Sequence, residues 1–126
     1  METGDLLAVY GLLRAGEVGF ERFGLAQAFE DIGPCIIPGK LYDLGRYPGL
    51  VEGEGRVAGE LFRVKNMSVM PQLDKYEDYD PADEAGSRYL RRRVALIEPD
   101  VAAWVYLWNR SVEDCKPIAN GDWLVR

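Results

Sequence analysis

One stretch decides how this chain folds: Val9-Tyr10-Gly11-Leu12-Leu13-Arg14, where an apolar run meets a glycine. The residues from Leu6 to Tyr10 predict a short buried strand, which Gly11 ends. A glycine directly after a buried strand allows unusual backbone angles and the close approach of a ligand. Successive N–H groups in such a turn can form an anion-binding concavity. Tyr10, Gly11, Leu12 and Leu13 are therefore candidates for holding a carboxylate, although a plain structural turn fits the same residues.

A second element lies far downstream, at Leu73-Asp74-Lys75-Tyr76-Glu77-Asp78-Tyr79-Asp80-Pro81. It predicts the end of a helix, where two tyrosines flank Glu77. A carboxylate beside aromatic surface loses hydration, which raises its pKa toward neutrality, as a general base acting at neutral pH requires. Glu77 is therefore the candidate base, and a solvated helix acid is the alternative. Asp74 and Asp78 share another helical face and are expected to be solvent-facing or structural.

A third group of candidates alternates along a predicted strand. Tyr89, Arg91 and Arg93 fall on one face of it. Tyr89 could present its hydroxyl to a pocket, and Arg91 could offer a charge partner to a carboxylate. A cross-strand packing face with arginine tips in water fits the same pattern equally well.

The composition narrows the chemistry further. The chain has 126 residues and no histidine, which excludes Ser-His-Asp and Cys-His schemes and nearly all catalytic zinc sites. Proton transfer must then use Glu, Asp, Lys, Tyr or Cys. Cys35 and Cys115 lack motif spacing, so reduced structural thiols are expected and no metal site.

The length fits a single domain over residues 1–126. A net charge of -6 argues against a nucleic-acid partner, since phosphates would be repelled. No apolar run approaches the roughly 20 residues that span a bilayer, and the acidic N-terminus is unlike a signal peptide. The sequence therefore predicts a cytoplasmic protein without a membrane partner.

Coarse patterning predicts many strands and two short helices, which indicates an α+β domain built on a small closed or nearly closed mixed sheet. The expected elements are a helix over 21–30 ended by Gly33-Pro34, a strand over 35–43 with a bulge at Pro38-Gly39, a loop over 45–55, a strand over 56–64, a helix from Asn66 or Ser68 to about Tyr79, and a hairpin of strands over 88–97 and 101–108.

An ordered set of short segments resembles the γ-glutamylcyclotransferase-like family, also called AIG2-like, over residues 7–123. The segments are Val9-Tyr10-Gly11-Leu12-Leu13-Arg14, Gly39-Lys40-Leu41-Tyr42-Asp43-Leu44-Gly45-Arg46-Tyr47-Pro48-Gly49, Val57-Ala58-Gly59-Glu60-Leu61-Phe62, Leu73-Asp74-Lys75-Tyr76-Glu77-Asp78-Tyr79, Tyr89-Leu90-Arg91, Ala103-Trp104-Val105-Tyr106 and Gly121-Asp122-Trp123.

The resemblance implies a small β-barrel with a few short helices. It implies that the backbone of Tyr10 to Leu13 holds the α-carboxylate of a γ-glutamyl group and that Glu77 is the catalytic glutamate. The implied reaction is attack of the α-amine of a small-molecule substrate on its own γ-carbonyl, which releases 5-oxoproline and an amine without a metal or organic cofactor. The family pattern has a small hydroxyl residue where this chain has Leu12, so a side-chain hydroxyl contact is lost.

Two other functions remain open at this point. The same scaffold could remove a γ-glutamyl protecting group in a biosynthetic pathway, or it could be a non-catalytic module that binds γ-glutamyl or other small molecules. Fold alone does not choose among them. The retained Glu77 argues against a purely binding role, and Leu12 keeps that role open.

Overall fold

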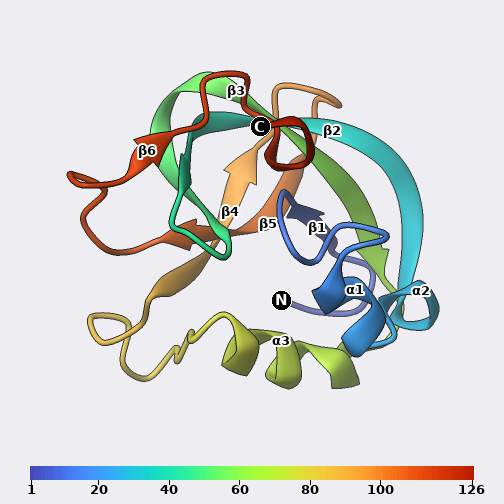
Figure 1. Cartoon of the computed structure of the whole chain (residues 1–126). Helices are drawn as coiled ribbons and strands as arrows, with labels where there is room; N and C mark the ends of the chain where they lie inside the picture. The colour runs from blue at the N-terminus through green and yellow to red at the C-terminus, as the bar shows by residue number, and fades with distance from the viewer.

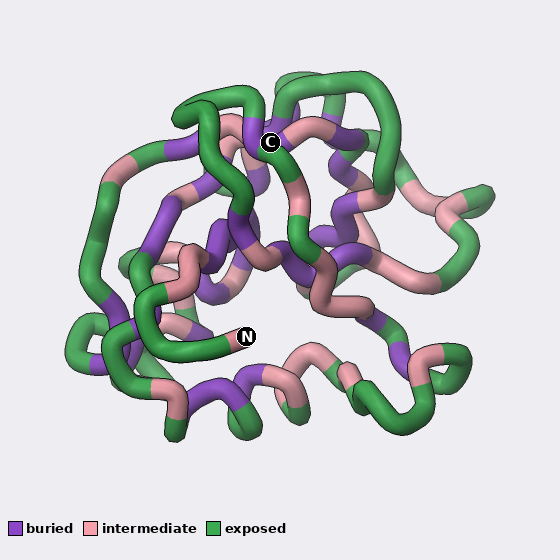
Figure 2. Tube along the Cα trace, turned by 180° about the vertical axis from the view of Figure 1, so that it is seen from behind, coloured by how far each residue is buried: buried purple, intermediate pink, exposed green.

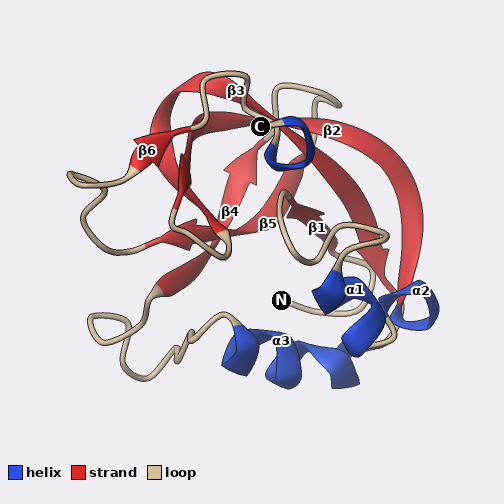
Figure 3. Cartoon of the chain, viewed as in Figure 1, coloured by secondary structure: helices blue, strands red, loops and turns tan.

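The computed structural model describes all 126 residues and centres on a six-stranded mixed sheet, ordered β4-β5-β1-β3-β2-β6. The sheet curls into a half-barrel with a few short helices at one side (Figure 1, Figure 3). This confirms the expected α+β class and the small mixed barrel. The strands are β1 (Leu6–Val9), β2 (Phe29–Asp43), β3 (Pro48–Val64), β4 (Tyr89–Ala95), β5 (Ala102–Trp108) and β6 (Lys116–Pro117), and the helices are α1 (Val18–Arg22), α2 (Leu25–Ala28), the 3₁₀ turn η1 (Met67–Val69), α3 (Met70–Tyr76) and the 3₁₀ turn η2 (Trp123–Val125).

The short strand β1 lies near the middle of the sheet. It pairs antiparallel with β3, where Val9 lies opposite Glu60, and parallel with β5, where Leu7 lies opposite Trp104. A strand with neighbours on both sides is buried, so its apolar sequence suits this place. The loop that follows β1 therefore leaves from the middle of the sheet.

Each face of the sheet carries its own apolar core, and β1 supplies both because alternate side chains point to opposite faces. Ala8 and Tyr10 belong to the core inside the curl, whereas Leu7 and Val9 belong to a second core on the other face. Leu73 and other residues of α2, η1 and α3 cover this second face. Figure 2 shows the buried segments along the central strands and the exposed ones in the connections.

The predicted helix over 21–30 is wrong in its extent. Two shorter helices, α1 and α2, are separated by Gly24, whose φ of 62° lies in the left-handed region. The chain is already a strand at Phe29, which is buried and pairs with Val64. Gly33-Pro34 then lies inside β2, where a register shift between Asp31 and Gly33 accommodates it.

The predicted loop over 45–55 is also wrong, because most of it belongs to β3. That strand begins at Pro48, and Leu50 is fully buried opposite Leu41. Burial of this apolar residue outweighs the glycines around it. The predicted bulge at Pro38-Gly39 is confirmed by a register shift between Pro38 and Lys40.

The predicted helix after residue 66 exists but is shorter. Asn66 caps the 3₁₀ turn η1, since its side chain accepts the Ser68 N–H at 3.0 Å, and η1 leads into α3, which ends at Tyr76. Asp78 has a φ of 54°, a left-handed conformation that does not continue a helix. The hairpin of β4 and β5 is confirmed. None of the helices is long and apolar enough to cross a membrane.

Candidate functional site

A cavity of about 180 Å³ lies where the loop after β1 faces the end of α3. Four regions supply its walls: the end of β1 with its loop, the end of α3, the residues before and at the start of β3, and the ends of β4 and β5. Its 14 lining residues are Ala8, Val9, Tyr10, Gly11, Leu12, Leu13, Tyr47, Pro48, Tyr76, Glu77, Asp78, Arg88, Tyr89 and Tyr106.

The loop wall offers three consecutive backbone donors. The N–H groups of Gly11, Leu12 and Leu13 donate to no acceptor in the protein. The carbonyls are engaged instead: that of Gly11 accepts the Arg14 N–H at 3.0 Å, and that of Leu12 accepts the Gly19 N–H at 2.8 Å. Unpaired backbone N–H groups are uncommon in a folded interior. The loop therefore has the carbonyls of Gly11 and Leu12 engaged, while its three donors are available to an anion in the cavity.

Gly11 is needed at its position for a different reason from the one that the sequence suggests. Its φ is not positive, so the expected unusual backbone angle is absent. A Cβ atom at Gly11 would instead lie 2.5 Å from Pro48 Cγ, far inside van der Waals contact. The glycine lets the turn pack directly against the first residue of β3.

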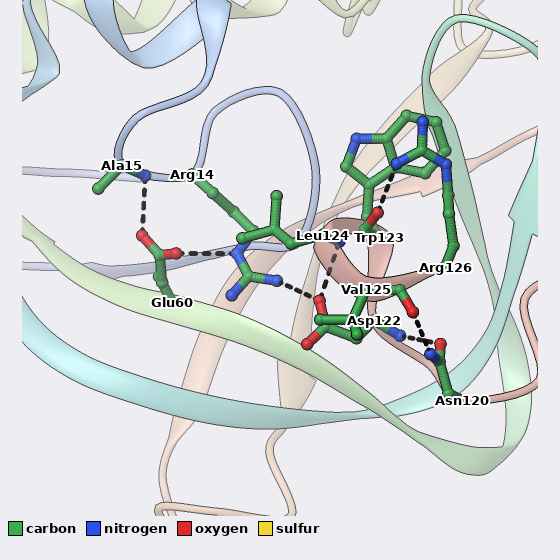
Figure 4. A network of polar contacts seen from close by, with 9 residues as sticks. All are labelled: Arg14, Ala15, Glu60, Asn120, Asp122, Trp123, Leu124, Val125 and Arg126. Atoms are coloured by element: carbon green, nitrogen blue, oxygen red, sulfur yellow. Dashed lines mark hydrogen bonds and ion pairs between the residues drawn. The ribbon is translucent and has the colours of Figure 1, made fainter.

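An ion-pair network that sequence reasoning missed anchors the end of this loop (Figure 4). Arg14 Nε donates to Glu60 Oε2 at 2.8 Å, and a terminal nitrogen of Arg14 donates to Asp122 Oδ1 at 3.0 Å. The Ala15 N–H donates to the other Glu60 oxygen at 2.8 Å. One arginine thus ties the loop to β3 and to the residue that caps η2. The available sequence signal was a cation directly after the turn.

Glu77 is the first residue after α3, and it lines the same cavity as the loop. Burial raises the pKa of its carboxyl from 4.5 to about 8, and the nearby negative charge of Asp74 adds to the effect. A carboxyl group with a pKa near neutrality can accept and return a proton at physiological pH. The structure thus brings Glu77 to the backbone donors of Gly11, Leu12 and Leu13.

Tyrosine rings form much of the remaining wall, and the hydroxyls of Tyr10, Tyr89 and Tyr106 are already engaged within the protein. The Tyr10 hydroxyl donates to the Tyr106 carbonyl at 2.6 Å and accepts the Leu50 N–H at 3.3 Å. The Tyr89 hydroxyl donates to the Pro48 carbonyl at 2.7 Å. Tyr89 therefore lines the cavity as expected, but it contributes its ring rather than a free hydroxyl.

Arg91 lies outside the cavity. Its guanidinium donates to Asp74 and lies over the rings of Tyr79 and Trp104, at 5.4 Å and 6.0 Å from the carbon to the ring centres. Asp74 and Asp78 were both expected to be solvent-facing or structural, and Asp74 is the structural one. The other, Asp78, is exposed at the cavity and forms an ion pair with Arg88 at 3.5 Å.

Three aromatic or charged lining residues had no role in the sequence-based prediction: Tyr47, Arg88 and Tyr106. Their sequence separation explains this, because only the fold brings them to one place. No cluster of three or more metal-ligating side chains is present.

Comparison with known proteins agrees with this architecture. The profile of the family described as "Gamma-glutamyl cyclotransferase, AIG2-like" matches residues 7–125. The chain is 35% identical over 118 residues to the γ-glutamylcyclotransferase family protein YtfP of Escherichia coli (strain K12), covering 94% of this chain and 95% of that protein.

Solved structures give the same result. The solution NMR structure of ytfP from Escherichia coli superposes with a TM-score of 0.68 at 32% identity, covering 96% of this chain and 97% of that one. The crystal structure of an AIG2-like protein from Mus musculus has a TM-score of 0.68 at 20% identity, with coverage of 90% and 82%, a likeness of fold alone. The chain belongs to the γ-glutamyl cyclotransferase, AIG2-like family.

Proposed function

We propose that this protein is a γ-glutamyl cyclotransferase, which converts a γ-glutamyl amine or γ-glutamyl peptide into 5-oxoproline and a free amine. One observation carries the proposal: the carboxyl of Glu77 and the three unpaired N–H groups of Gly11, Leu12 and Leu13 line one small cavity. A γ-glutamyl group carries the two charges that these walls complement, an α-carboxylate and an α-ammonium.

In the proposed complex the α-carboxylate accepts hydrogen bonds from the loop N–H groups, and the α-ammonium lies beside Glu77. The rings of Tyr10, Tyr89 and Tyr106 enclose the aliphatic part of the substrate and exclude water. With both charges fixed, the γ-glutamyl chain must fold back, so that the amine meets the γ-carbonyl. Such orientation can supply much of the rate enhancement of an intramolecular reaction.

The proton balance needs only one enzymic group. The Glu77 carboxylate removes a proton from the α-ammonium, and the neutral amine attacks the γ-carbonyl carbon. A C–N bond forms, the five-membered ring closes, and the original amide C–N bond breaks. The leaving amine takes the proton that Glu77 holds, which restores the carboxylate, and the second proton of the ring nitrogen passes to the released amine, which departs as an ammonium ion. The nucleophile belongs to the substrate, so the absence of histidine from the chain is no obstacle.

The raised pKa of Glu77 suits both halves of this cycle. In the free protein at pH 7 most molecules hold a proton on this carboxyl, because its pKa is about 8. A bound ammonium favours the carboxylate, since opposite charges stabilise each other. Activity should therefore rise with pH as the Glu77 carboxyl loses its proton.

The test is mass-spectrometric detection of 5-oxoproline after incubating the purified protein with a panel of γ-glutamyl amines and peptides. Glu77→Gln removes the base with little change of shape, so turnover should fall about 10²- to 10⁴-fold. Glu21→Gln makes the same change at an exposed acid of α1 and is the matched control.

Equal 5-oxoproline release by Glu77→Gln and wild type would contradict the assignment of the base. If wild type releases no 5-oxoproline from any compound but is thermally stabilised by some of them, the protein is a binding module instead.

A further inference from the structure

Asp74 lies on α3 three residues before Glu77, the residue that follows the helix, so the two side chains are neighbours and not on separate faces as the sequence pattern predicted. The Asp74 carboxylate is mostly buried. Asp74 Oδ1 accepts the Tyr106 hydroxyl at 2.7 Å and also accepts from the guanidinium of Arg91. The side chains of Asp74 and Arg91 are only 17% and 15% exposed.

Tyr106 links the two walls of the cavity. Its hydroxyl holds Asp74 on the helix side, and its carbonyl accepts the Tyr10 hydroxyl at 2.6 Å on the loop side. Tyr106 itself is 3% exposed and lines the cavity between them. Tyr106 of β5 therefore connects the end of α3 to the residue that precedes the loop.

Arg91 completes the cluster from β4. The rings of Tyr79 and Trp104 flank its guanidinium, and its Nε is buried without a hydrogen-bond partner. Asp74 is its ion-pair partner. A buried ion pair gains little stability over apolar residues of the same size, because both charges lose hydration. The pair of Asp74 and Arg91 is therefore better explained by its effect on the neighbouring Glu77 than by a gain in stability.

The titratable groups around Glu77 come from every element that borders the cavity. The tyrosines are Tyr10, Tyr47, Tyr76, Tyr89 and Tyr106. The charged side chains are Asp78 and Arg88, which line the cavity, and Asp74, which lies outside it. Asp78 and Arg88 are paired and exposed, so water screens them. Asp74 is the mostly buried acid of the set, and its charge raises the pKa of Glu77.

We propose that Asp74 is a positioning residue for Glu77: through Tyr106 and Arg91 it fixes the end of α3 against β4 and β5, and it presents a largely buried negative charge to the Glu77 carboxyl. The catalytic meaning of this inference rests on the proposed function. The electrostatic part of the inference, the effect of the Asp74 charge on the Glu77 carboxyl, concerns the free protein and does not depend on turnover.

The first experiment is a carbon-13 NMR titration of the Glu77 carboxyl in the free protein, with the signal assigned by its loss in Glu77→Gln. Asp74→Asn keeps the shape and the acceptor oxygen but removes the charge, so the midpoint of the Glu77 titration should move to lower pH. Asp78→Asn removes a neighbouring but exposed charge, and it should move the midpoint less.

The second experiment separates position from charge. Tyr106→Phe removes the hydroxyl that holds Asp74 but leaves the Asp74 charge, so the Glu77 midpoint should stay near its wild-type value. Without this hydrogen bond the end of α3 is less well fixed, and kcat for 5-oxoproline release should fall about 10-fold with little change in KM. In Asp74→Asn the rising limb of kcat/KM against pH should follow the NMR midpoint, because kcat/KM reports ionisations of the free protein.

An unchanged Glu77 midpoint in Asp74→Asn would overturn the electrostatic part of the inference. A wild-type kcat in Tyr106→Phe would overturn the positioning part. If the wild-type protein itself releases no 5-oxoproline, the proposed function fails, and the inference is then reduced to its electrostatic part, which the titrations of the free protein decide alone.

Discussion

The two walls of the cavity present different chemical groups to a ligand. The loop wall, residues 11–13, presents neutral backbone N–H groups, whereas the helix wall presents the carboxyl of Glu77. Most side-chain substitutions leave backbone N–H donors in place. The protonation state of a carboxyl group, in contrast, depends on the charges and hydrogen bonds around it. The comparison teaches that substitutions in the loop should alter fit, and substitutions at the helix end should alter proton transfer.

The anchors of the two walls mirror each other. On the loop side one cation, Arg14, holds two carboxylates, those of Glu60 and Asp122. On the helix side one carboxylate, that of Asp74, accepts from two donors, Tyr106 and Arg91. The loop anchor lies outside the cavity, so it has no direct effect on Glu77. Four experiments can break or sharpen this contrast, and the largest expected effect is on the helix side.

Replacing Glu77 by Gln should make the protein more stable at high pH. The pKa of Glu77 is raised from 4.5 to about 8 in the folded state, so the folded state binds the proton more tightly than the unfolded one. Stability must then fall as pH rises between these values. The neutral amide avoids this loss, and the variant should gain up to about 5 kcal/mol over wild type at pH 8 and above, at about 1.4 kcal/mol for each pKa unit.

Urea denaturation at several pH values measures this gain. The difference between variant and wild type should be small below pH 4.5 and should grow toward pH 8. The remaining access of Glu77 to the cavity makes the stated gain an upper limit. A difference that does not depend on pH would mean that the carboxyl is hydrated and that the helix wall is no more sensitive than the loop wall.

Arg14→Met tests the loop anchor. The side chains of Arg14, Glu60 and Asp122 are 11%, 20% and 26% exposed, so removing the cation leaves two partly buried acids without a partner. We expect a loss of about 2 to 3 kcal/mol in the free energy of unfolding and substrate binding about 10-fold weaker. Arg14→Lys can pair with only one of the acids and should recover part of both losses.

The contrast predicts that Arg14→Met leaves the Glu77 titration midpoint close to its wild-type value, because the lost charge lies outside the cavity. A large displacement of that midpoint would show that the two walls are electrostatically coupled, and the comparison would then fail.

Gly11→Ala tests the contact of the loop with β3. The added Cβ would lie 2.5 Å from Pro48 Cγ, so the turn or the proline must move. Overpacking of this kind costs about 1 to 3 kcal/mol, and the displaced N–H groups should weaken binding of a γ-glutamyl ligand. Pro48→Ala removes the opposing atoms, so the double variant should recover stability. Calorimetric melting of the two single variants and the double variant provides the measurement.

Leu12→Ser should have the smallest effect. Leu12 is a lining residue of the cavity and packs against the core inside the curl, and serine would supply the hydroxyl that the family resemblance implies at this position. Because the N–H of residue 12 is unchanged, KM for a γ-glutamyl substrate should change by less than about 3-fold. A much larger change in KM would mean that the side chain of residue 12, rather than its backbone N–H, recognises the substrate. The loop wall would then not act through its backbone donors alone.

The sequence predicted the parts of the site that are local in the chain. The end of β1 and its turn follow from an apolar run and a glycine, and Glu77 stands out as an acid between aromatic residues. Asp74 could not be assigned a role in this way. Its partners Tyr106 and Arg91 lie on other strands, 32 and 17 residues away, and only strand pairing brings them together.

The errors in the fold have a similar cause. The glycines between residues 45 and 55 predict a loop, but the burial of Leu50 opposite Leu41 keeps that segment in β3. Phe29 belongs to a helical pattern locally, yet its pairing with Val64 makes it a strand residue. In both places long-range packing outweighs local preference.

The bonds that assemble the cavity also determine when it can form. The hydrogen bond from Tyr10 to Tyr106 joins residues 96 positions apart, and that from Arg14 to Asp122 joins residues 108 apart. Contacts between such distant segments carry a high entropy of loop closure and slow the folding of a chain. We therefore expect the cavity to be among the last parts to form, absent from the transition state. A bound ligand should then slow unfolding and leave the folding rate nearly unchanged.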